Sequence, residues 1–206
     1  MIDKRFSIIK KYIKDKKVLD IGCVQHDISN IDNDSWLHGF IRKHAKDVVG
    51  IDIEKEGVNY LKNKGLDVRY EDAQDFDLDE KFDVIVAGEI IEHLSNFEGF
   101  IKSMKKHMKD NSRIIITTPN PFFIRRFIDI LLFGKLKARN EEHTCWLDEQ
   151  SLRELMRRYD LRNEDTFFVV GGKARYANKI NKILPLSDKF TKRTMVSIWE
   201  AGEQTI

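Results

Sequence analysis

Acidic residues stand at or just after the ends of three predicted strands. Asp20 and Gly22 close the first apolar run, Asp52 closes the second, and Asp72 with Ala73 follows the third. A glycine at such a turn lets a ligand approach the backbone, because no Cβ intervenes. A carboxylate after the second strand can accept from both ribose hydroxyls, and one after the third can accept from an adenine amino group. Each feature alone is typical of a solvated acid or a plain turn, but the three in order predict a nucleoside site.

A second group of polar residues follows the fourth predicted strand. It contains Glu89, Glu92 and His93, and His143 lies further along the chain. If residues 89–93 form a helical turn, the first three share one face. Two carboxylates and two imidazoles suit a divalent ion such as Mg, Mn, Fe, Co or Zn. A metal-free interpretation stays open, in which His93 is a general base or bonds a helix start and His143 is a loop histidine.

These residues need strands and helices that bring them together. Short apolar runs bounded by Gly, Pro or acidic residues predict strands at 17–21, 48–53, 67–70, 82–87, 113–118, 167–170 and 195–199. Helical spacing of apolar residues predicts helices at 4–14, 56–64, 95–109 and 148–159. A further helix carries Trp36, Leu37, Phe40 and Ile41, with Asn33 or Asp34 as its expected cap. The alternation indicates a parallel α/β sheet, which binds ligands beyond the carboxyl ends of its strands.

Five segments together resemble the class I S-adenosylmethionine (SAM)-dependent methyltransferases. They are VLDIGC at 18–23, VVGIDI at 48–53, YEDAQDF at 70–76, KFDVIVAGEIIEHL at 81–94 and IIITTPNPF at 114–122. The resemblance covers roughly residues 15–160 and is closest to quinone-biosynthesis O-methyltransferases and small-RNA 3′-end 2′-O-methyltransferases. It implies SAM as cofactor and a Rossmann-like α/β sandwich. Its mostly parallel seven-stranded sheet would have the order 3-2-1-4-5-7-6, with the last strand antiparallel and helices on both faces.

The resemblance also implies roles for particular residues. The implied cofactor-binding residues are Asp20, Gly22, Cys23, Asp52, Ile53, Asp72, Ala73 and Glu89. Glu89 would lie beside the transferable methyl group, and the implied catalytic residues are Glu89, His93 and His143. The metal candidates Glu89, Glu92, His93 and His143 resemble the metal site of the small-RNA enzymes, where the ion lowers the pKa of the acceptor hydroxyl.

The glycine loop departs from the family pattern. Val24 and His26 stand where the family usually has two more glycines. We therefore expect His26 or Asp27 to contact the amino-acid end of the cofactor instead. The same departure counts against an NAD-dependent oxidoreductase, because a pyrophosphate needs those glycines to sit on a helix N-terminus. A noncatalytic SAM-binding module remains an alternative.

The composition is that of a globular protein, with 206 residues, a net charge of +2, 41% hydrophobic and 34% charged residues. One domain over residues 1–206 is expected from the length. Cys23 and Cys145 do not form a disulfide or zinc pattern, so we expect a cytoplasmic protein. No apolar run has the roughly 18 residues that a membrane span needs, and no stable membrane insertion is expected.

Two segments, near 120–147 and 171–193, are expected on the acceptor side. Phe122, Phe123, Phe127, Ile130 and Leu131 would line an apolar acceptor pocket or touch a membrane, although an ordinary core-facing helix is favoured. The basic segment 173–193 would meet phosphate groups of RNA, a nucleotide-sugar or a lipid headgroup, although a solvated helix face is favoured. The expected reaction is methyl transfer to a hydroxyl of a small molecule, saccharide or lipid-like intermediate. A metal-dependent RNA 2′-O-methyltransferase is the alternative, and the oligomeric state is not predicted.

Overall fold

The computed structural model describes residues 4–25, 33–134, 141–170 and 187–202, and its strands form a seven-stranded sheet. The strands are β1 Lys17–Ile21, β2 Asp47–Asp52, β3 Val68–Tyr70, β4 Phe82–Gly88, β5 Met108–Pro119, β6 Leu161–Val169 and β7 Thr194–Ala201. Their order is β3-β2-β1-β4-β5-β7-β6. β7 is antiparallel to β5 and β6, and the other pairs are parallel. The predicted strand order and the antiparallel last strand are confirmed.

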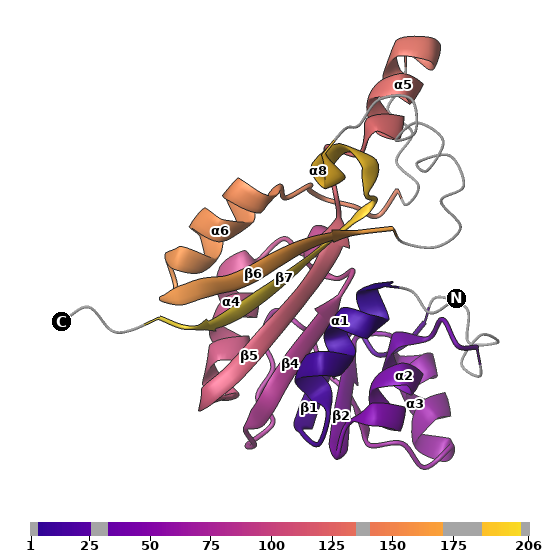
Figure 1. Cartoon of the computed structure of the whole chain (residues 1–206). Helices are drawn as coiled ribbons and strands as arrows, with labels where there is room; N and C mark the ends of the chain where they lie inside the picture. The colour runs from indigo at the N-terminus through magenta and orange to yellow at the C-terminus, as the bar shows by residue number, and fades with distance from the viewer. Residues whose placement is uncertain (1–3, 26–32, 135–140, 171–186, 203–206) are drawn as a thin grey trace.

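Helices cover both faces of this sheet, as predicted (Figure 1). They are α1 Lys4–Ile13, α2 Leu37–His44, α3 Lys55–Asn63, the 3-10 helix η2 Ile91–His93, α4 Phe97–Lys106, α5 Ile124–Phe133, α6 Glu149–Arg157 and α8 Asp188–Thr191. Successive strand residues point to opposite faces. Val18 and Val84 therefore pack with α1 and α2, while their neighbours Leu19 and Ile85 pack with α4 and α6. Both faces being apolar explains why the strands read as continuous hydrophobic runs.

The helix α2 begins later than expected and lacks the predicted cap. It starts at Leu37, and Trp36 precedes it without a side-chain cap hydrogen bond. Asn33 instead closes a turn upstream. Its side chain accepts from the Ser35 N–H at 3.2 Å, and its carbonyl accepts from the Trp36 N–H at 3.0 Å. The prediction of Asn33 or Asp34 as the helix cap is therefore wrong.

The helix α5 does not face the core. None of its residues is buried, and the side chains of Leu131, Leu132 and Phe133 are 83%, 70% and 68% exposed. Figure 1 shows α5 extending away from the sheet. The favoured prediction of an ordinary core-facing helix is wrong here. The guanidinium carbon of Arg126 lies 4.2 Å from the ring centroid of Trp146, which connects α5 to the segment before α6.

Two strands extend further than the sequence predicts. β6 begins six residues before its expected start at residue 167, and β5 begins five residues before residue 113. Charged residues hide the added part of β6 from a hydrophobic pattern. Arg162 pairs with Glu200 of β7, and Glu164 pairs with Arg113 of β5. Ion pairs between β6 and β7, and across β7 between β6 and β5, thus replace apolar burial at this edge of the sheet.

Some residues singled out in the sequence lie outside the described part of the chain, namely His26, Asp27, Lys173, Arg175, Tyr176, Lys179 and Lys182. In the described part of the basic segment, Lys189 pairs with Glu149 and Lys192 pairs with Asp188. None of the described helices has the length and apolar character to cross a membrane.

Candidate active site

The carboxyl ends of β1, β2 and β3 meet at one edge of the sheet. Ile21 of β1 is in register with Ile51 of β2, and Asp52 of β2 with Tyr70 of β3. The N–H of Gly22 donates to the Ile51 carbonyl at 2.9 Å, which fixes the turn after β1. The fold thus brings together the strand-end acids that the sequence predicts as a nucleoside site.

Asp52 connects the end of β2 to the loop after β1. Its Oδ2 accepts from the Val24 N–H at 2.8 Å, and its Oδ1 accepts from the Glu54 N–H at 2.9 Å. Burial raises the pKa of Asp52, and these two amides oppose that shift. Each carboxylate oxygen has a second lone pair, so the group can still accept from two ribose hydroxyls.

Gly22 gives the turn after β1 a shape that other residues adopt at a cost. Its φ is +80°, in the left-handed region that favours glycine. A Cβ at this position would lie 2.3 Å from Cδ1 of Ile90, so a side chain would also collide with the segment after β4. Both the backbone conformation and the close packing of Ile90 therefore favour glycine at this turn, which the resemblance implies as a cofactor contact.

Asp20 is buried on β1 and bonds a histidine of α2. Its Oδ2 lies 2.8 Å from Nδ1 of His38, and both side chains are almost completely buried. Its Oδ1 is also buried and has no partner among the described residues. Burial raises the pKa of Asp20, and the hydrogen bond from His38 acts in the opposite direction. The Trp36 indole N–H donates to the carbonyl of Cys23 at 2.9 Å, so Trp36 and His38, at the start of α2, hold the end of β1 and the turn after it.

The adenine side of the expected pocket follows β3. The Asp72 Oδ1 accepts from the Gln74 N–H at 2.8 Å, and Ala73 packs against the core. Gln74 then accepts from the Asn96 N–H at 2.7 Å, which connects this turn to the start of α4. Ile53, just after β2, is 62% exposed and presents an apolar face beside Asp52. An apolar side chain next to hydrogen-bonding acids suits a nucleoside, which has a flat base and a polar sugar.

Glu89 does not share a helical turn with Glu92 and His93. Its φ is +56°, and η2 begins only at Ile91, so the expected helical turn over 89–93 is wrong. The Glu89 N–H donates to the Thr117 carbonyl at 2.8 Å, which holds the residue at the end of β4. Its Oε1 lies 3.8 Å from Nη1 of Arg5 on α1.

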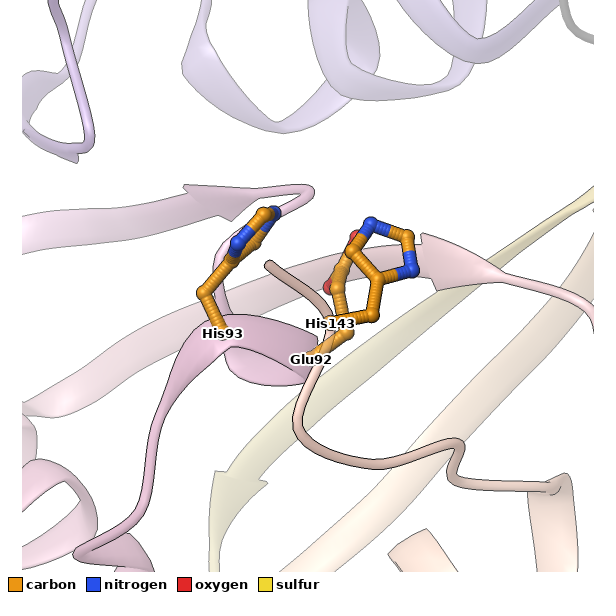
Figure 2. Close-up of side chains that lie close together, drawn as sticks. All are labelled: Glu92, His93 and His143. Carbon is orange, nitrogen blue, oxygen red and sulfur yellow. The ribbon is translucent and has the colours of Figure 1, made fainter. Parts of the chain in front are cut away.

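Glu92, His93 and His143 come together as a compact cluster (Figure 2). One ligand atom from each lies within 4.8 Å of the others, and Glu89 is not part of this group. The Glu92 Oε2 accepts from the Thr118 hydroxyl at 3.0 Å, while Oε1 is buried without a partner among the described residues. Burial, with a smaller contribution from Glu89, raises the pKa of Glu92 to about 8. An oxygen and two nitrogens are a suitable donor set for a divalent transition metal.

The segment 141–147 is tied to η2, which positions His143. The Thr144 N–H donates to the Glu92 carbonyl at 2.9 Å, and the Thr144 hydroxyl donates to the Leu94 carbonyl at 2.9 Å. The His93 and His143 rings then lie edge to face, with centroids 4.7 Å apart. Burial and the neighbouring His93 lower the pKa of His143. His143 is therefore predominantly neutral near pH 7 and able to accept a proton.

Sequence reasoning missed three residues of this site: Arg5, His38 and Thr118. Arg5 lies on α1, far from Glu89 in the sequence, and no local sequence pattern predicts their contact. His38 occupies a position at which helical spacing predicts only packing. Thr118 falls inside the predicted fifth strand, and its role depends on β5 lying beside β4.

A cavity of about 400 Å³ lies beyond the end of β5, where acceptor-side elements were expected. Its lining residues are Asn120, Phe122, Asp148, Glu149, Gln150, Ser151, Phe168 and Lys189. Asn120 follows Thr118 by two residues, about 7 Å along an extended chain. Asn120 donates to the carbonyls of Lys189 and Lys192 at 2.6 and 2.8 Å, which fixes α8 over the strand end. The lining combines aromatic faces with charged and amide groups.

Comparison with known proteins also indicates a methyltransferase domain. Residues 3–166 match the family model described as a methyltransferase domain. The ubiquinone biosynthesis O-methyltransferase of Rickettsia conorii (strain ATCC VR-613 / Malish 7) is 28% identical over 125 residues, which are 58% of this chain and 40% of that protein. This relative and seven further curated relatives are matched over 30% to 64% of their own length. The chain therefore spans about half the length of these relatives.

Solved structures share the fold at low sequence identity. A SAM-dependent methyltransferase from Archaeoglobus fulgidus has a TM-score of 0.64 and 18% identity, covering 95% of this chain and 91% of that one. The O-methyltransferase from a trans-AT PKS multienzyme of Brevibacillus brevis, in complex with S-adenosyl-L-homocysteine, has a TM-score of 0.57 and 16% identity, covering 97% and 71%. With the family match over residues 3–166 and this strand order, the chain belongs to the methyltransferase domain family and has the class I SAM-dependent methyltransferase fold.

Proposed function

We propose that this domain transfers the methyl group of SAM to a hydroxyl of a small-molecule, saccharide or lipid-like acceptor. The observation that carries the proposal is the placement of the acids Asp20, Asp52 and Asp72 at or just after the ends of three adjacent strands, with the cluster of Glu92, His93 and His143 after the neighbouring strand β4. Relatives named O-methyltransferases support an oxygen acceptor.

The residues of the chain fit SAM at both ends. Asp20, Gly22 and Cys23 would hold its amino-acid part, since they form the end of β1 and the turn after it, and Oδ1 of Asp20 is buried without a partner among the described residues. Asp52 with Ile53 would hold the ribose. When bound, SAM supplies an already activated methyl group, so positioning of the acceptor provides much of the rate.

Asp72 and Ala73 complete this fit at the adenine end of the pocket. The Asp72 carboxylate would accept from the adenine amino group, and the Ala73 backbone N–H would meet a ring nitrogen. Glu89 lies at the end of β4, toward the reacting group in this arrangement.

The acceptor hydroxyl must lose its proton during transfer, and the cluster after β4 offers the groups to take it. The pKa of His143 is lowered, so its imidazole is available as a base at neutral pH. The rings of His93 and His143 lie edge to face, 4.7 Å apart, and Glu89 lies at the end of β4. We assign His93 and His143 as general-base candidates and Glu89 as a group that orients the acceptor.

A divalent metal at Glu92, His93 and His143 is the second candidate for the same cluster. It is favoured by the buried Oε1 of Glu92, which has no partner among the described residues, and by the raised pKa of that carboxyl. A bound ion would supply Lewis-acid activation of the acceptor oxygen. Glu92 would then be an ionised ligand, and the two imidazoles would be neutral ligands.

The acceptor-side cavity supports a small polar acceptor with a ring. Phe122 and Phe168 offer flat apolar faces, while Gln150 offers a hydrogen-bonding amide. Cavities of this size suit metabolite-sized ligands. An RNA acceptor has less support, since the described lysines of the basic segment already pair with carboxylates.

Calorimetry with SAM, S-adenosylhomocysteine (SAH) and NAD tests the cofactor assignment. We expect micromolar-range binding of SAM and SAH, no binding of NAD, and loss of SAH binding in Asp52→Ala. Asp47→Ala is the matched control, because Asp47 is an exposed aspartate at the opposite end of the same strand. A chain that binds NAD, or that binds neither SAM nor SAH, contradicts the proposal.

Incubation of cell extract with SAM carrying a CD3 group tests catalysis. A labelled product that requires His93 and His143 is expected, with the label on oxygen by mass spectrometry. Binding of SAM without any labelled product in acceptor-containing extract would favour the noncatalytic module.

A further inference from the structure

The loop after β1 lacks two of the usual glycines, yet side chains from its neighbours hold it firmly. Val24 has its N–H bonded by Asp52 at 2.8 Å, and Cys23 has its carbonyl bonded by the Trp36 indole at 2.9 Å. A third contact, between His38 and Asp20, reaches the strand end itself. The α2 helix therefore takes part in forming the cofactor turn.

Only one of the two carboxylate oxygens of Asp20 is hydrogen-bonded to His38. In its ionised form the Asp20 carboxylate can only accept, and Nδ1 of His38 then carries the hydrogen of the 2.8 Å bond to Oδ2. The side chains of His38 and Asp20 are 1% and 2% exposed, and Oδ1 of Asp20 has no partner among the described residues. Buried polar atoms are nearly always bonded, so an atom of this kind calls for a ligand or a water.

Asp20, whose Oδ1 has no partner among the described residues, lies close to the turn that would hold the cofactor. Asp20 lies two residues after Val18, so its side chain projects to the same α2 side of β1, and it precedes Gly22 of the turn by two residues. Burial raises the pKa of Asp20, which makes the site responsive to a cation that favours the carboxylate form. The amino-acid end of SAM and SAH carries an ammonium group.

We propose that His38 is a positioning residue for the cofactor: it fixes the Asp20 carboxylate so that Oδ1 accepts from the cofactor ammonium group, directly or through one bound water. This contact would compensate in part for the cofactor contacts that the loop loses by having Val24 and His26 in place of glycines. The inference rests on the proposed use of SAM and is independent of the acceptor.

Three probes separate this role from general support of the fold. SAH carries the ammonium group, decarboxylated SAH keeps it, and 5′-methylthioadenosine lacks the whole amino-acid part. In His38→Leu we expect affinity for SAH and decarboxylated SAH to fall by about ten-fold or more, because a hydrogen bond to a charged group is lost. Affinity for 5′-methylthioadenosine should stay within about two-fold.

Two further variants and a control sharpen the test. His38→Asn places an amide N–H near the position of Nδ1 and should restore most of the SAH affinity. Asp20→Asn keeps the side-chain shape and should reproduce the loss for the two ammonium-bearing probes, even if His38→Leu fails to fold. His44→Leu is the matched control, since His44 lies on the same helix and bonds only the Phe40 carbonyl of that helix in this structure.

The outcomes are distinguishable. Equal weakening of all three probes would mean that His38 merely supports the loop, and no weakening would mean that Oδ1 bonds something other than the cofactor; either result overturns the inference alone. Wild-type protein that binds none of the probes overturns the proposed function and the inference together.

Discussion

Two buried carboxylates, Asp20 and Glu92, are each hydrogen-bonded to a side chain through only one of their two oxygens. The other oxygen of each is buried without a partner among the described residues. Leaving such an atom unsatisfied costs about 1–3 kcal/mol. Asp20 lies near the end of β1, and Glu92 lies in η2, just after β4. Both atoms are therefore close to strand ends that form the candidate site. A ligand at each place accounts for both.

Glu92→Gln should increase the free energy of unfolding relative to wild type in EDTA-treated protein, and increasingly so as the pH rises. Burial raises the folded pKa of Glu92 from 4.5 to about 8. The folded state then binds this proton more tightly than the unfolded chain, so wild-type stability is lost as the pH rises from the unfolded value through the folded one. The difference should grow by at most on the order of 5 kcal/mol, since one pKa unit corresponds to about 1.4 kcal/mol. Urea unfolding at pH values on both sides of this window measures it.

Glu98→Gln provides the control for that measurement. Glu98 is an exposed carboxyl on α4 whose pKa is lowered by its bond with Lys102, so its variant should show no growing advantage above pH 6. A stability difference for Glu92→Gln that does not change with pH would mean that Glu92 ionises at its ordinary pKa.

The candidate site residues with a local signal could be proposed from the sequence, and those that depend on tertiary contacts could not. Asp52 and Asp72 could be found because each follows a strand that its own apolar run predicts. His38 and Arg5 could not, because their partners lie on other elements of the fold. Glu89 was assigned to a helical turn because its spacing from Glu92 fits one, but its positive φ takes it out of that turn.

At the scale of elements, the strands were predictable because both faces of the sheet are covered. Burial on both sides requires continuous apolar runs, and glycine, proline or acid ends them. The ends of α2 and α5 were less predictable. Asn33 serves a turn before α2, and the apolar face of α5 has no described element to cover it. Periodicity marks an apolar face but does not identify its neighbour.

Replacing Leu131 and Leu132 together by Gln should change the free energy of unfolding by no more than about 0.5 kcal/mol. Both side chains are largely exposed, and substitutions at such positions remove little packing. Ile116→Ala is the comparison, because Ile116 is fully buried on β5 and its truncation should cost about 2–5 kcal/mol. Urea unfolding of the three proteins decides. A loss near that of Ile116→Ala would mean that α5 is covered in solution.

The segment 141–147 and η2 should behave as one unit in metal binding. Thr144→Val removes the hydroxyl that bonds the Glu92 and Leu94 carbonyls, so His143 loses its fixed position. We expect about ten-fold weaker Co²⁺ binding, followed by the visible absorption of the ion, as for other residues that support metal ligands. SAH affinity should not change.

Thr166→Val is the matched control for Thr144→Val, since its hydroxyl bonds Asn163 within β6. Unaltered Co²⁺ affinity in Thr144→Val would show that the segment is not held by this threonine. Absence of Co²⁺ binding in wild type would leave the metal-free general base as the function of the cluster.

At the scale of the whole molecule, the two parts of the site are built by different elements. The proposed cofactor side uses the ends of β1, β2 and β3, held by Trp36 and His38 at the start of α2. The proposed acceptor side uses η2, the segment 141–147 and the end of β5. Asp52 and His143 can therefore be altered separately, and each ligand should stabilise the folded chain through its own residues.

Thermal unfolding with each ligand tests this division. SAH at 100 times its Kd should stabilise the fold by about 2.7 kcal/mol, which raises Tm by roughly 5–10 °C for a chain of this size. Asp52→Ala should lose the SAH shift and keep a shift with Co²⁺, whereas His143→Ala should do the reverse. Sites that share no residues give additive effects, so the two shifts should sum in wild type. A variant that loses both shifts together would mean that the cofactor turn and the cluster after β4 form a single cooperative unit, and the separation by strand ends would then be wrong.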